Sequence, residues 1–350
     1  MMRRHIAVTL LFTIAATSSA ALLGAVSARW VPLSSGVAAT FRGVSTVSDT
    51  VAWASGSGST VLRTADAGKT WLPLTVTADR LDFRDVDAID ARTAYALSIG
   101  AGAASRIYKT IDAGATWTLQ YTNQDPKGFL DAMAFWDAAH GIVVGDSVNG
   151  AFSILLTADG GKTWTPASAL PPALQGEGAF AASGTNVAVF GNSDAWFATG
   201  AAATSRVLHT RDRGRSWTIA DTPLKGGGSA GAFSVAFRDA LHGVVVGGDY
   251  QKEAEAIDNL AITNDGGGTW TASKEHALSG FRSLVAHAPG TKTSWIAVGP
   301  QGADWSDNDG RTWSAIAGTG FHTFSFSPSG RAGFGAGGKG TIGKLEIGGR

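Results

Sequence analysis

The sequence predicts an all-β protein, a single seven-bladed β-propeller of four-stranded blades. Three observations lead there: a turn motif repeated at regular intervals, short apolar strand-like segments around each copy, and an unusual composition. The chain has 350 residues with 47 Gly, 12 Trp and only 16% charged residues. A chain that is 44% hydrophobic with zero net charge is not disordered, and its glycine content excludes a helical bundle.

The balanced charge and the lack of cysteine argue against further classes of protein and site. Lys and Arg together number 28, as do Asp and Glu, which argues against a broad basic surface for nucleic acid. No cysteine is present, so disulfides and zinc-thiolate sites are excluded.

Residues 1–28 predict a signal peptide. Basic Arg3 and Arg4 precede an apolar stretch at 6–16, and small residues lead to a cleavage point after Ala28. We therefore expect export to the periplasm or beyond the cell. The alternative is an uncleaved anchor, because residues 6–26 are long enough to span a bilayer.

The repeated motif reads Thr/Ser-x-Asp-x-Gly-x-Thr/Ser-Trp and is called here the Asp–Trp motif. Its five complete copies hold Asp66 and Trp71, Asp112 and Trp117, Asp159 and Trp164, Asp212 and Trp217, and Asp265 and Trp270. A sixth copy has Asn308 at the Asp position and ends at Trp313. Successive Trp residues are 46, 47, 53, 53 and 43 positions apart, the interval of a propeller repeat.

Each motif is predicted to be a hairpin turn between two strands. Strand-like residues 59–63 precede Asp66, and residues 71–76 follow it. An Asp side chain accepts N–H groups within such a turn, Gly supplies a positive φ, and Trp covers the turn with an apolar face. One copy per blade indicates a structural role in preference to a catalytic or metal-binding one.

The number of strand pairs sets the number of blades. Seven inner pairs accompany six motifs, and the last unit has three strands, at 321–327, 331–336 and 341–347. Residues 30–34 resemble the outer strand that follows Trp71, so they are predicted to add the fourth strand and close the ring. The domain then covers residues 29–350, with about 46 residues per blade.

The Asp–Trp motif resembles the Asp-box (BNR-type) repeat of secreted propellers. The seven units over residues 30–350 resemble the photosystem II stability/assembly factor-like family. That resemblance implies a non-enzymatic scaffold or chaperone that binds a membrane-protein segment outside the cytoplasm. Sialidases also carry Asp-boxes, but none of the four Tyr here stands in a recognisable catalytic context, and the Arg-Ile-Pro element is missing.

Polar residues at the starts of the inner strands form the candidate site. Three arginines and a histidine follow equivalent phenylalanines, and two acids fall near the corresponding positions: Arg42, Arg84, Arg282, His322, Asp131 and Glu177. In a propeller these positions meet at one mouth of the axial channel, where arginines suit a carboxylate or other planar anion. The alternative is a structural ring in which the arginines pair with Asp85, Asp131 and Glu177. Long connections at 123–127, 170–177 and 250–259 are further candidates for recognition.

We therefore expect an exported, monomeric binding or assembly module. Its partner would be a protein or peptide segment, such as one from a membrane protein, or else a glycan or other anionic ligand. No metal, cofactor or nucleic acid is expected, and no cofactor motif supports an oxidoreductase. The alternative is a glycan-processing hydrolase, for which Asp131 and Glu177 are the only carboxylate pair to nominate.

Overall fold

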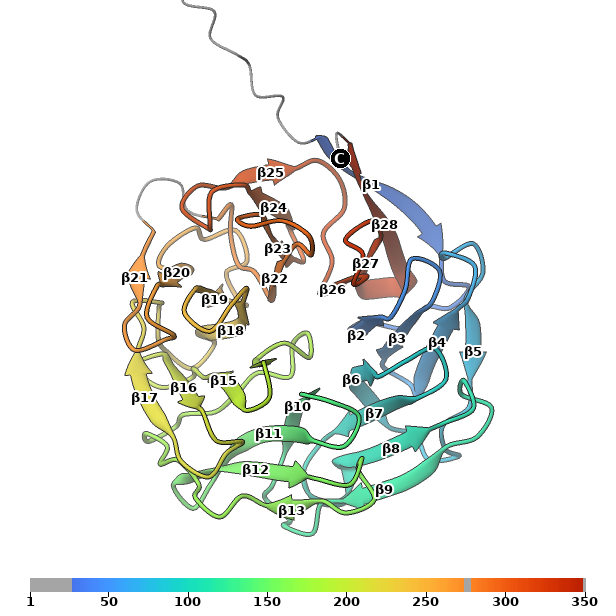
Figure 1. Ribbon diagram of the computed structural model, residues 1–350, viewed down its shortest axis with the longest axis horizontal. Helices are drawn as coiled ribbons and strands as arrows, with labels where there is room; N and C mark the ends of the chain where they lie inside the picture. The colour runs from blue at the N-terminus through green and yellow to red at the C-terminus, as the bar shows by residue number, and fades with distance from the viewer. Residues whose placement is uncertain (1–26, 274–277, 349–350) are drawn as a thin grey trace, which may run out of the picture.

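The computed structural model describes residues 27–273 and 278–348. These residues form seven antiparallel four-stranded sheets arranged around a central axis (Figure 1). The predicted seven-bladed propeller is thereby confirmed. Two short 3-10 turns, Gly102–Ala104 and Gly338–Gly340, are the only helical elements in the described part of the chain. None of the described residues belongs to a helix long and apolar enough to cross a membrane.

Blades 1 to 7 each run from an innermost to an outermost strand. The innermost strands are β2 (Phe41–Thr46), β6 (Asp82–Ala88), β10 (Leu130–Phe135), β14 (Val187–Phe190), β18 (Ala230–Phe237), β22 (Leu284–His287) and β26 (Thr323–Phe326). The second strands are β3 (Ala52–Gly56), β7 (Ala94–Ile99), β11 (Gly141–Val148), β15 (Asp194–Ala198), β19 (Gly243–Asp249), β23 (Trp295–Gly299) and β27 (Gly333–Ala336). The third strands are β4 (Thr60–Thr64), β8 (Arg106–Thr110), β12 (Ala151–Thr157), β16 (Arg206–Thr210), β20 (Leu260–Thr263), β24 (Gly302–Ser306) and β28 (Thr341–Gly348). The outermost strands are β5 (Leu72–Leu74), β9 (Thr118–Thr122), β13 (Thr165–Pro166), β17 (Thr218–Asp221), β21 (Thr271–Ala272), β25 (Ser314–Ile316) and β1 (Ser27–Ser34).

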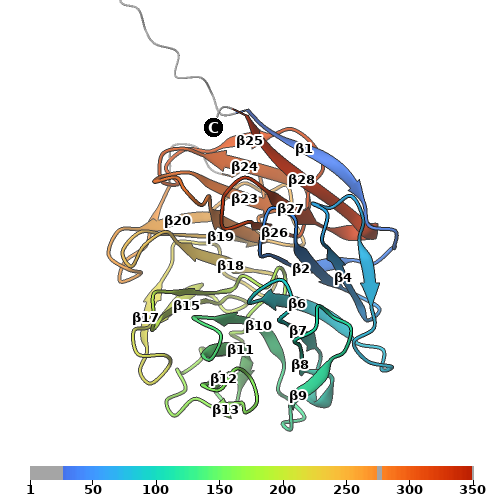
Figure 2. The ribbon, with the colours of Figure 1, turned by 45° about the vertical axis from the view of Figure 1, so that its right-hand side comes forward.

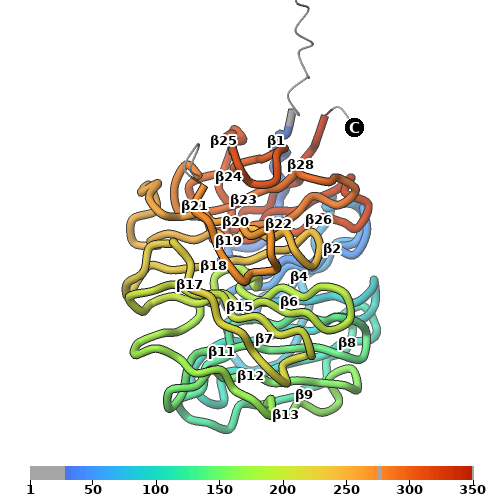
Figure 3. Tube along the Cα trace, turned by 60° about the vertical axis from the view of Figure 1, so that its left-hand side comes forward, coloured from blue at the N-terminus to red at the C-terminus, as the bar shows by residue number. Residues whose placement is uncertain are grey.

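The N-terminal strand closes the ring, as predicted. β1 pairs with β28 from Ser27 opposite Gly348 to Ser34 opposite Thr341, so both ends of the domain lie in blade 7 (Figures 2 and 3). The strand begins earlier than the expected residues 30–34, and Ala28 lies within it. The rest of the predicted signal peptide, residues 1–26, lies outside the described residues, so the leader stays a prediction.

The hydrophobic core is divided among the blade interfaces. Seven clusters of buried side chains each join two adjacent blades. Between blades 1 and 2, for example, Trp53 and Val61 contact Phe83 and Tyr108, and Trp53 is fully buried. A single sheet therefore has no core of its own and depends on its two neighbours.

Each motif tryptophan belongs to the interface with the preceding blade. Trp71 of blade 1 meets Phe334 of blade 7 edge to face, with 5.8 Å between ring centroids. The same holds in every interface, for Trp71, Trp117, Trp164, Trp217, Trp270 and Trp313, and for Trp30 in blade 7. The sequence predicts that each motif tryptophan covers its own turn. The structure shows that the tryptophan rings also pack between adjacent blades.

The motif aspartate organises the turn through three hydrogen bonds. Asp66 Oδ1 accepts from Thr64 Oγ1 and the Thr70 N–H, both at 2.9 Å, and Oδ2 accepts from Thr70 Oγ1 at 2.6 Å. These bonds recur in all five complete copies. Asn308 preserves the pattern, because its Oδ1 accepts the Thr312 N–H at 2.9 Å and its Nδ2 donates to Thr312 Oγ1.

Two consecutive residues of the turn are left-handed. In all six copies both the motif glycine and the residue before it have positive φ, and Ala67 and Ala113 hold this conformation at 62° and 64°. The glycine is also needed for space. A Cβ on Gly68 would lie 2.7 Å from Leu33 Cδ1 of the preceding blade. The turn thus docks on that blade through a residue without a side chain.

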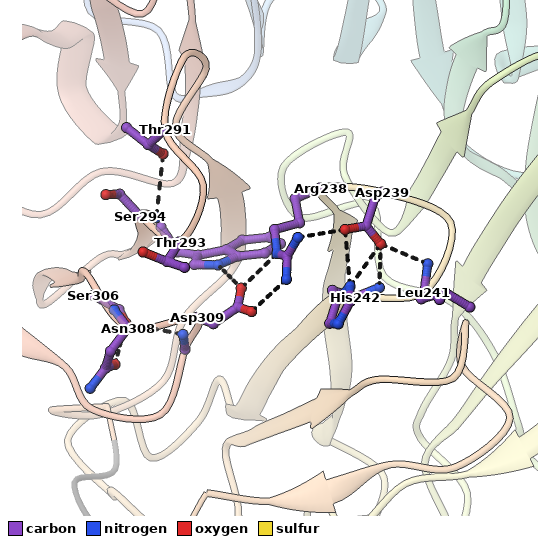
Figure 4. A network of polar contacts seen from close by, with 12 residues as sticks. Arg238, Asp239, Leu241, His242, Thr291, Thr293, Ser294, Ser306, Asn308 and Asp309 are labelled. Atoms are coloured by element: carbon purple, nitrogen blue, oxygen red, sulfur yellow. Dashed lines mark hydrogen bonds and ion pairs between the residues drawn. The ribbon is translucent and has the colours of Figure 1, made fainter.

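In the sixth motif an ion pair reinforces this docking (Figure 4). Asp309 occupies the position after Asn308, and its carboxylate pairs with Arg238 of blade 5 at 2.8 and 2.9 Å. Arg238 is held in turn by Asp239, which also contacts His242 Nδ1 at 2.9 Å. The pair spans the interface between blades 5 and 6.

The left-handed alanines provide a test of turn strain. We expect Ala113→Gly to raise the free energy of unfolding by about 0.5–1 kcal/mol, because about 1–2 kcal/mol of left-handed strain outweighs the added chain entropy of glycine. Ala115→Gly, two residues later at an exposed position without positive φ, is the matched control and should be neutral or destabilising. Urea unfolding measures both. A loss of stability in Ala113→Gly would contradict the strain argument.

Candidate functional site

β-Bulges interrupt the strands around one mouth of the axis. A register shift leaves one extra residue at each of five positions: Arg42 on β2, Arg84 on β6, Asp131 on β10, Asp146 on β11 and Phe233 on β18. A bulge takes its residue out of the regular alternation and re-aims the side chain. All five residues line the same cavity.

This axial cavity has a volume of about 390 Å³. Every blade contributes to its lining, through Arg42, Arg84, Asp131, Phe180, Phe233, Phe281 and His322 in the order of blades 1 to 7. Since all seven blades meet there, the cavity lies on the ring axis. Its volume is within the range of sites for small molecules and short chain segments.

An irregular segment, residues 179–185, crosses the axis and forms one wall of the cavity. It leads into blade 4 and is the yellow-green connection that reaches the centre of the ring in Figure 1. We call it the axial segment. It bonds to all six other blades, through Arg42, Arg84, Asp146, Ser234, Ser283 and Thr323. It is followed by the innermost strand of blade 4, β14, which begins at Val187.

Two arginines form the cationic side of the cavity. Arg84 Nε donates to Asp82 at 2.9 Å, and its Nη1 donates to the Ala181 carbonyl at 3.1 Å. Arg42 Nη1 reaches the Ala182 carbonyl at 3.4 Å, and its buried Nε has no partner among the described residues. Burial and the neighbouring Arg84 lower the pKa of Arg42 to about 10, so it remains charged at neutral pH.

Two carboxyl groups face the cavity from blade 3. Asp131 is 1% exposed, and its Oδ2 has no hydrogen-bond partner within the described chain. Asp146 Oδ1 accepts the Ala179 N–H at 2.8 Å. Burial raises the pKa of both groups, and Asp146 raises that of Asp131 further. Across residues 27–273 and 278–348, no group of three or more His, Asp or Glu could hold a metal ion.

His322 is a neutral member of the site. Its Nδ1 lies 3.1 Å from the Phe41 carbonyl, which it can reach only as a donor. Burial and the nearby Arg42 lower its pKa to about 4. The positive charge on this side of the cavity therefore comes from the two arginines.

Aromatic rings form an apolar wall. Phe180 of the axial segment stacks on Phe233 with 3.8 Å between centroids, and Phe281 meets Phe233 edge to face at 4.7 Å. Tyr250 completes the wall at the rim and is 45% exposed. An apolar side chain of a ligand would therefore find a preformed contact beside the arginines.

Two of the predicted site residues lie elsewhere. Arg282 is 1% exposed and pairs with Asp304 through Nε at 2.7 Å and Nη2 at 2.6 Å. β22 begins at Leu284 and has no bulge, so nothing re-aims Arg282 toward the axis. Glu177 is likewise buried, where it accepts from Arg206 and Thr199. The structure therefore brings together Arg42, Arg84, Asp131 and His322 but neither Arg282 nor Glu177.

Other residues of the cavity were missed by the sequence reasoning. Asp146 sits on a second strand, and Phe180 lies in a segment whose sequence resembles an inner strand. Tyr250 and Glu253 belong to the long charged connection at 250–259, whose length signalled recognition. No pattern in the sequence indicated the bulge at Phe233.

Comparison with known proteins supports the fold. No protein-family model matches the chain, and no curated protein is detectably similar to it. Among solved structures, YCF48 bound to D1 peptide superposes with a TM-score of 0.65 at 17% identity, covering 91% of this chain and 96% of that one. YCF48 from Cyanidioschyzon merolae gives 0.64 at 16% identity, with 91% and 99% covered. U3-55K gives 0.63 at only 10% identity, with 91% and 98% covered. At such identities the likeness shows a shared architecture.

Arg282 and Arg42 should differ sharply in stability tests. Arg282→Ala leaves Asp304 buried without its partner, so we expect a loss of about 3–5 kcal/mol in the free energy of unfolding. Arg42→Ala removes a guanidinium that has one long hydrogen bond, and its cost should stay below about 1 kcal/mol. Denaturant unfolding of the two variants decides the matter. Equal losses would mean that Arg42 is also structural.

Stability should pass through a maximum in mildly acidic solution. Burial raises the pKa of Asp85 and Asp131, and that of Asp87 to about 6, so the native state binds protons more tightly than the unfolded chain. Stability is then lost as pH rises from about 4 through 6. Hydrogen bonds from Thr70 lower the pKa of Asp66 to about 2, as the equivalent bonds do for Asp112, so their contribution is lost as pH falls from about 4 to 2.

Calorimetric melting between pH 2 and 8 measures both limbs. Asp131→Asn should flatten the limb above pH 4, whereas Asp66→Asn, which copies the natural Asn308, should alter only the acidic limb. Unchanged profiles in both variants would contradict these assignments.

Proposed function

We propose that this protein is an exported, non-enzymatic binding module that captures a protein segment through an anionic group at the axial cavity. One observation carries the proposal: Arg42, mostly buried beside a second guanidinium, has a buried Nε without a partner among the described residues. Two like charges in a confined site repel each other; Asp82 on the Arg84 Nε offsets part of this repulsion, and a further anion would offset more of it. A carboxylate would supply acceptors that match the planar donors of both arginines.

The aromatic wall indicates that the anionic group belongs to a polypeptide. Phe180, Phe233 and Phe281 lie in the same cavity as the arginines, so a residue next to the anionic group can bury an apolar side chain. One of the structurally similar propellers was solved bound to a D1 peptide. We extend peptide binding to this chain as a proposal. The proposed export of the protein rests on the signal peptide predicted at residues 1–28.

A glycan-processing hydrolase has less support. It requires two carboxyl groups on either side of a scissile bond. Of the nominated pair, only Asp131 lines the cavity, because Glu177 is held by Arg206 in a buried ion pair.

Peptide selection provides the test. We expect peptides selected from a displayed random library to carry a carboxylate beside an apolar residue. The Arg42→Ala/Arg84→Ala double variant should bind them at least about tenfold more weakly, since each charge-assisted hydrogen bond contributes about 1.5–3 kcal/mol. Fluorescence anisotropy with synthetic peptides measures the affinities.

The matched control is Arg106→Ala. Arg106 lies on the third strand of blade 2 and pairs with exposed Asp79, away from the cavity. Its removal should leave binding unchanged. Peptides that bind the double variant as tightly as the natural protein would refute the proposed function.

A further inference from the structure

The axial cavity has guanidinium groups at one end and carboxyl groups at the other, which an anion alone does not explain. Arg42 and Arg84 approach from blades 1 and 2, whereas Asp131 and Asp146 approach from blade 3. Within the described part of the chain, neither acid takes part in an ion pair; the pairs that are formed involve other carboxylates. Burial raises the pKa of both acids and so favours their neutral forms, and a cationic group of a ligand would stabilise the ionised forms.

Asp131 provides the sharpest evidence at the acidic end. Its side chain is almost fully buried, it lines the cavity, and its Oδ2 is unpartnered within the described residues. Buried polar atoms are nearly always hydrogen-bonded in native proteins. The atom is therefore available to a donor group brought by a ligand.

The axial segment contacts both ends of the cavity, so its length indicates how far the carboxyl groups lie from the arginines. Ala179 donates its N–H to Asp146 and the backbone of Ala181 bonds to Asp131, while the carbonyls of Ala181 and Ala182 accept from Arg84 and Arg42. The two ends are thus bridged by one to three residues of chain, which span at most about 11 Å. The protein's own backbone thus places a donor at the acidic end and acceptors at the basic end, in the N-to-C direction.

From these contacts we infer that the ligand is zwitterionic: a peptide whose cationic group meets Asp131 and Asp146 and whose anionic group, one to three residues further on, meets Arg42 and Arg84. An apolar side chain between them lies against the ring of Phe180. The inference rests on the proposed function and adds the cationic half of the ligand. It also sets the spacing and the direction of the bound peptide.

Four forms of one tripeptide test the inference. The probe has a central phenylalanine between two alanines, with both ends free, the N-terminus acetylated, the C-terminus amidated, or both ends blocked. We expect isothermal titration calorimetry to show the tightest binding for the free form. Blocking either end should weaken binding about tenfold or more, since each block removes a charged partner.

Two near-isosteric variants assign the ends. Asp146→Asn keeps an acceptor for the Ala179 N–H but removes the charge, so it should weaken the free tripeptide and leave the acetylated form unaffected. Arg84→Gln should weaken the acetylated form and leave the amidated form unaffected. Thermal melting verifies that both variants are folded.

The outcomes separate the inference from the proposed function. Equal affinity for the free and acetylated forms would overturn the zwitterionic ligand while leaving capture of an anion intact. If none of the four forms binds, the inference is likewise wrong, and the selected longer peptides still decide the proposed function. If those peptides ignore the arginine substitutions, the proposed function fails by its own test.

Discussion

The docking of each Asp–Trp turn on the preceding blade is the contact on which the ring depends. The turn brings a buried tryptophan and a glycine without side chain to the neighbouring sheet, and the aspartate fixes the loop that presents them. The turns of blades 1 to 6 supply this contact at six interfaces, and at the seventh Trp30 of β1 supplies the tryptophan without a turn. Because the cores lie between the blades, a blade gains its stability only when its neighbours are in place.

The predictable parts of the fold were those encoded by local chemistry. Asp66 and its equivalents could be assigned to hairpin turns, because an Asp followed two residues later by Gly is typical of such turns. Residues 30–34 could be assigned to the closing strand, because they resemble the outer strand that follows Trp71. The candidate site was predicted less well. Arg42, Arg84 and Arg282 each follow a phenylalanine, but only the first two stand at bulges, and register shifts depend on strand pairing that the sequence pattern does not reveal.

The axial segment illustrates the same limit over a longer range. Its residues are small and nearly apolar, so its local sequence resembles that of an ordinary inner strand. Instead the segment crosses the axis, where carbonyl groups and hydroxyls of residues 181–185 meet donors and acceptors from the other blades. Those partners come from distant parts of the chain, so no local pattern could identify them. The result is a cavity with a guanidinium end, a carboxyl end and an aromatic side.

The pairing of β1 with β28 has a consequence for how the molecule folds. Ser27 meets Gly348 across almost the whole sequence, so we expect this pairing to form late, once the intervening blades have brought the two ends together. The thermodynamic penalty is modest, because loop-closure entropy grows with the logarithm of length. Joining the two ends costs only about 2 kcal/mol more than closing a loop the length of one blade. Until β1 is in place, the two interfaces of blade 7 lack the side chains of Trp30 and Leu33.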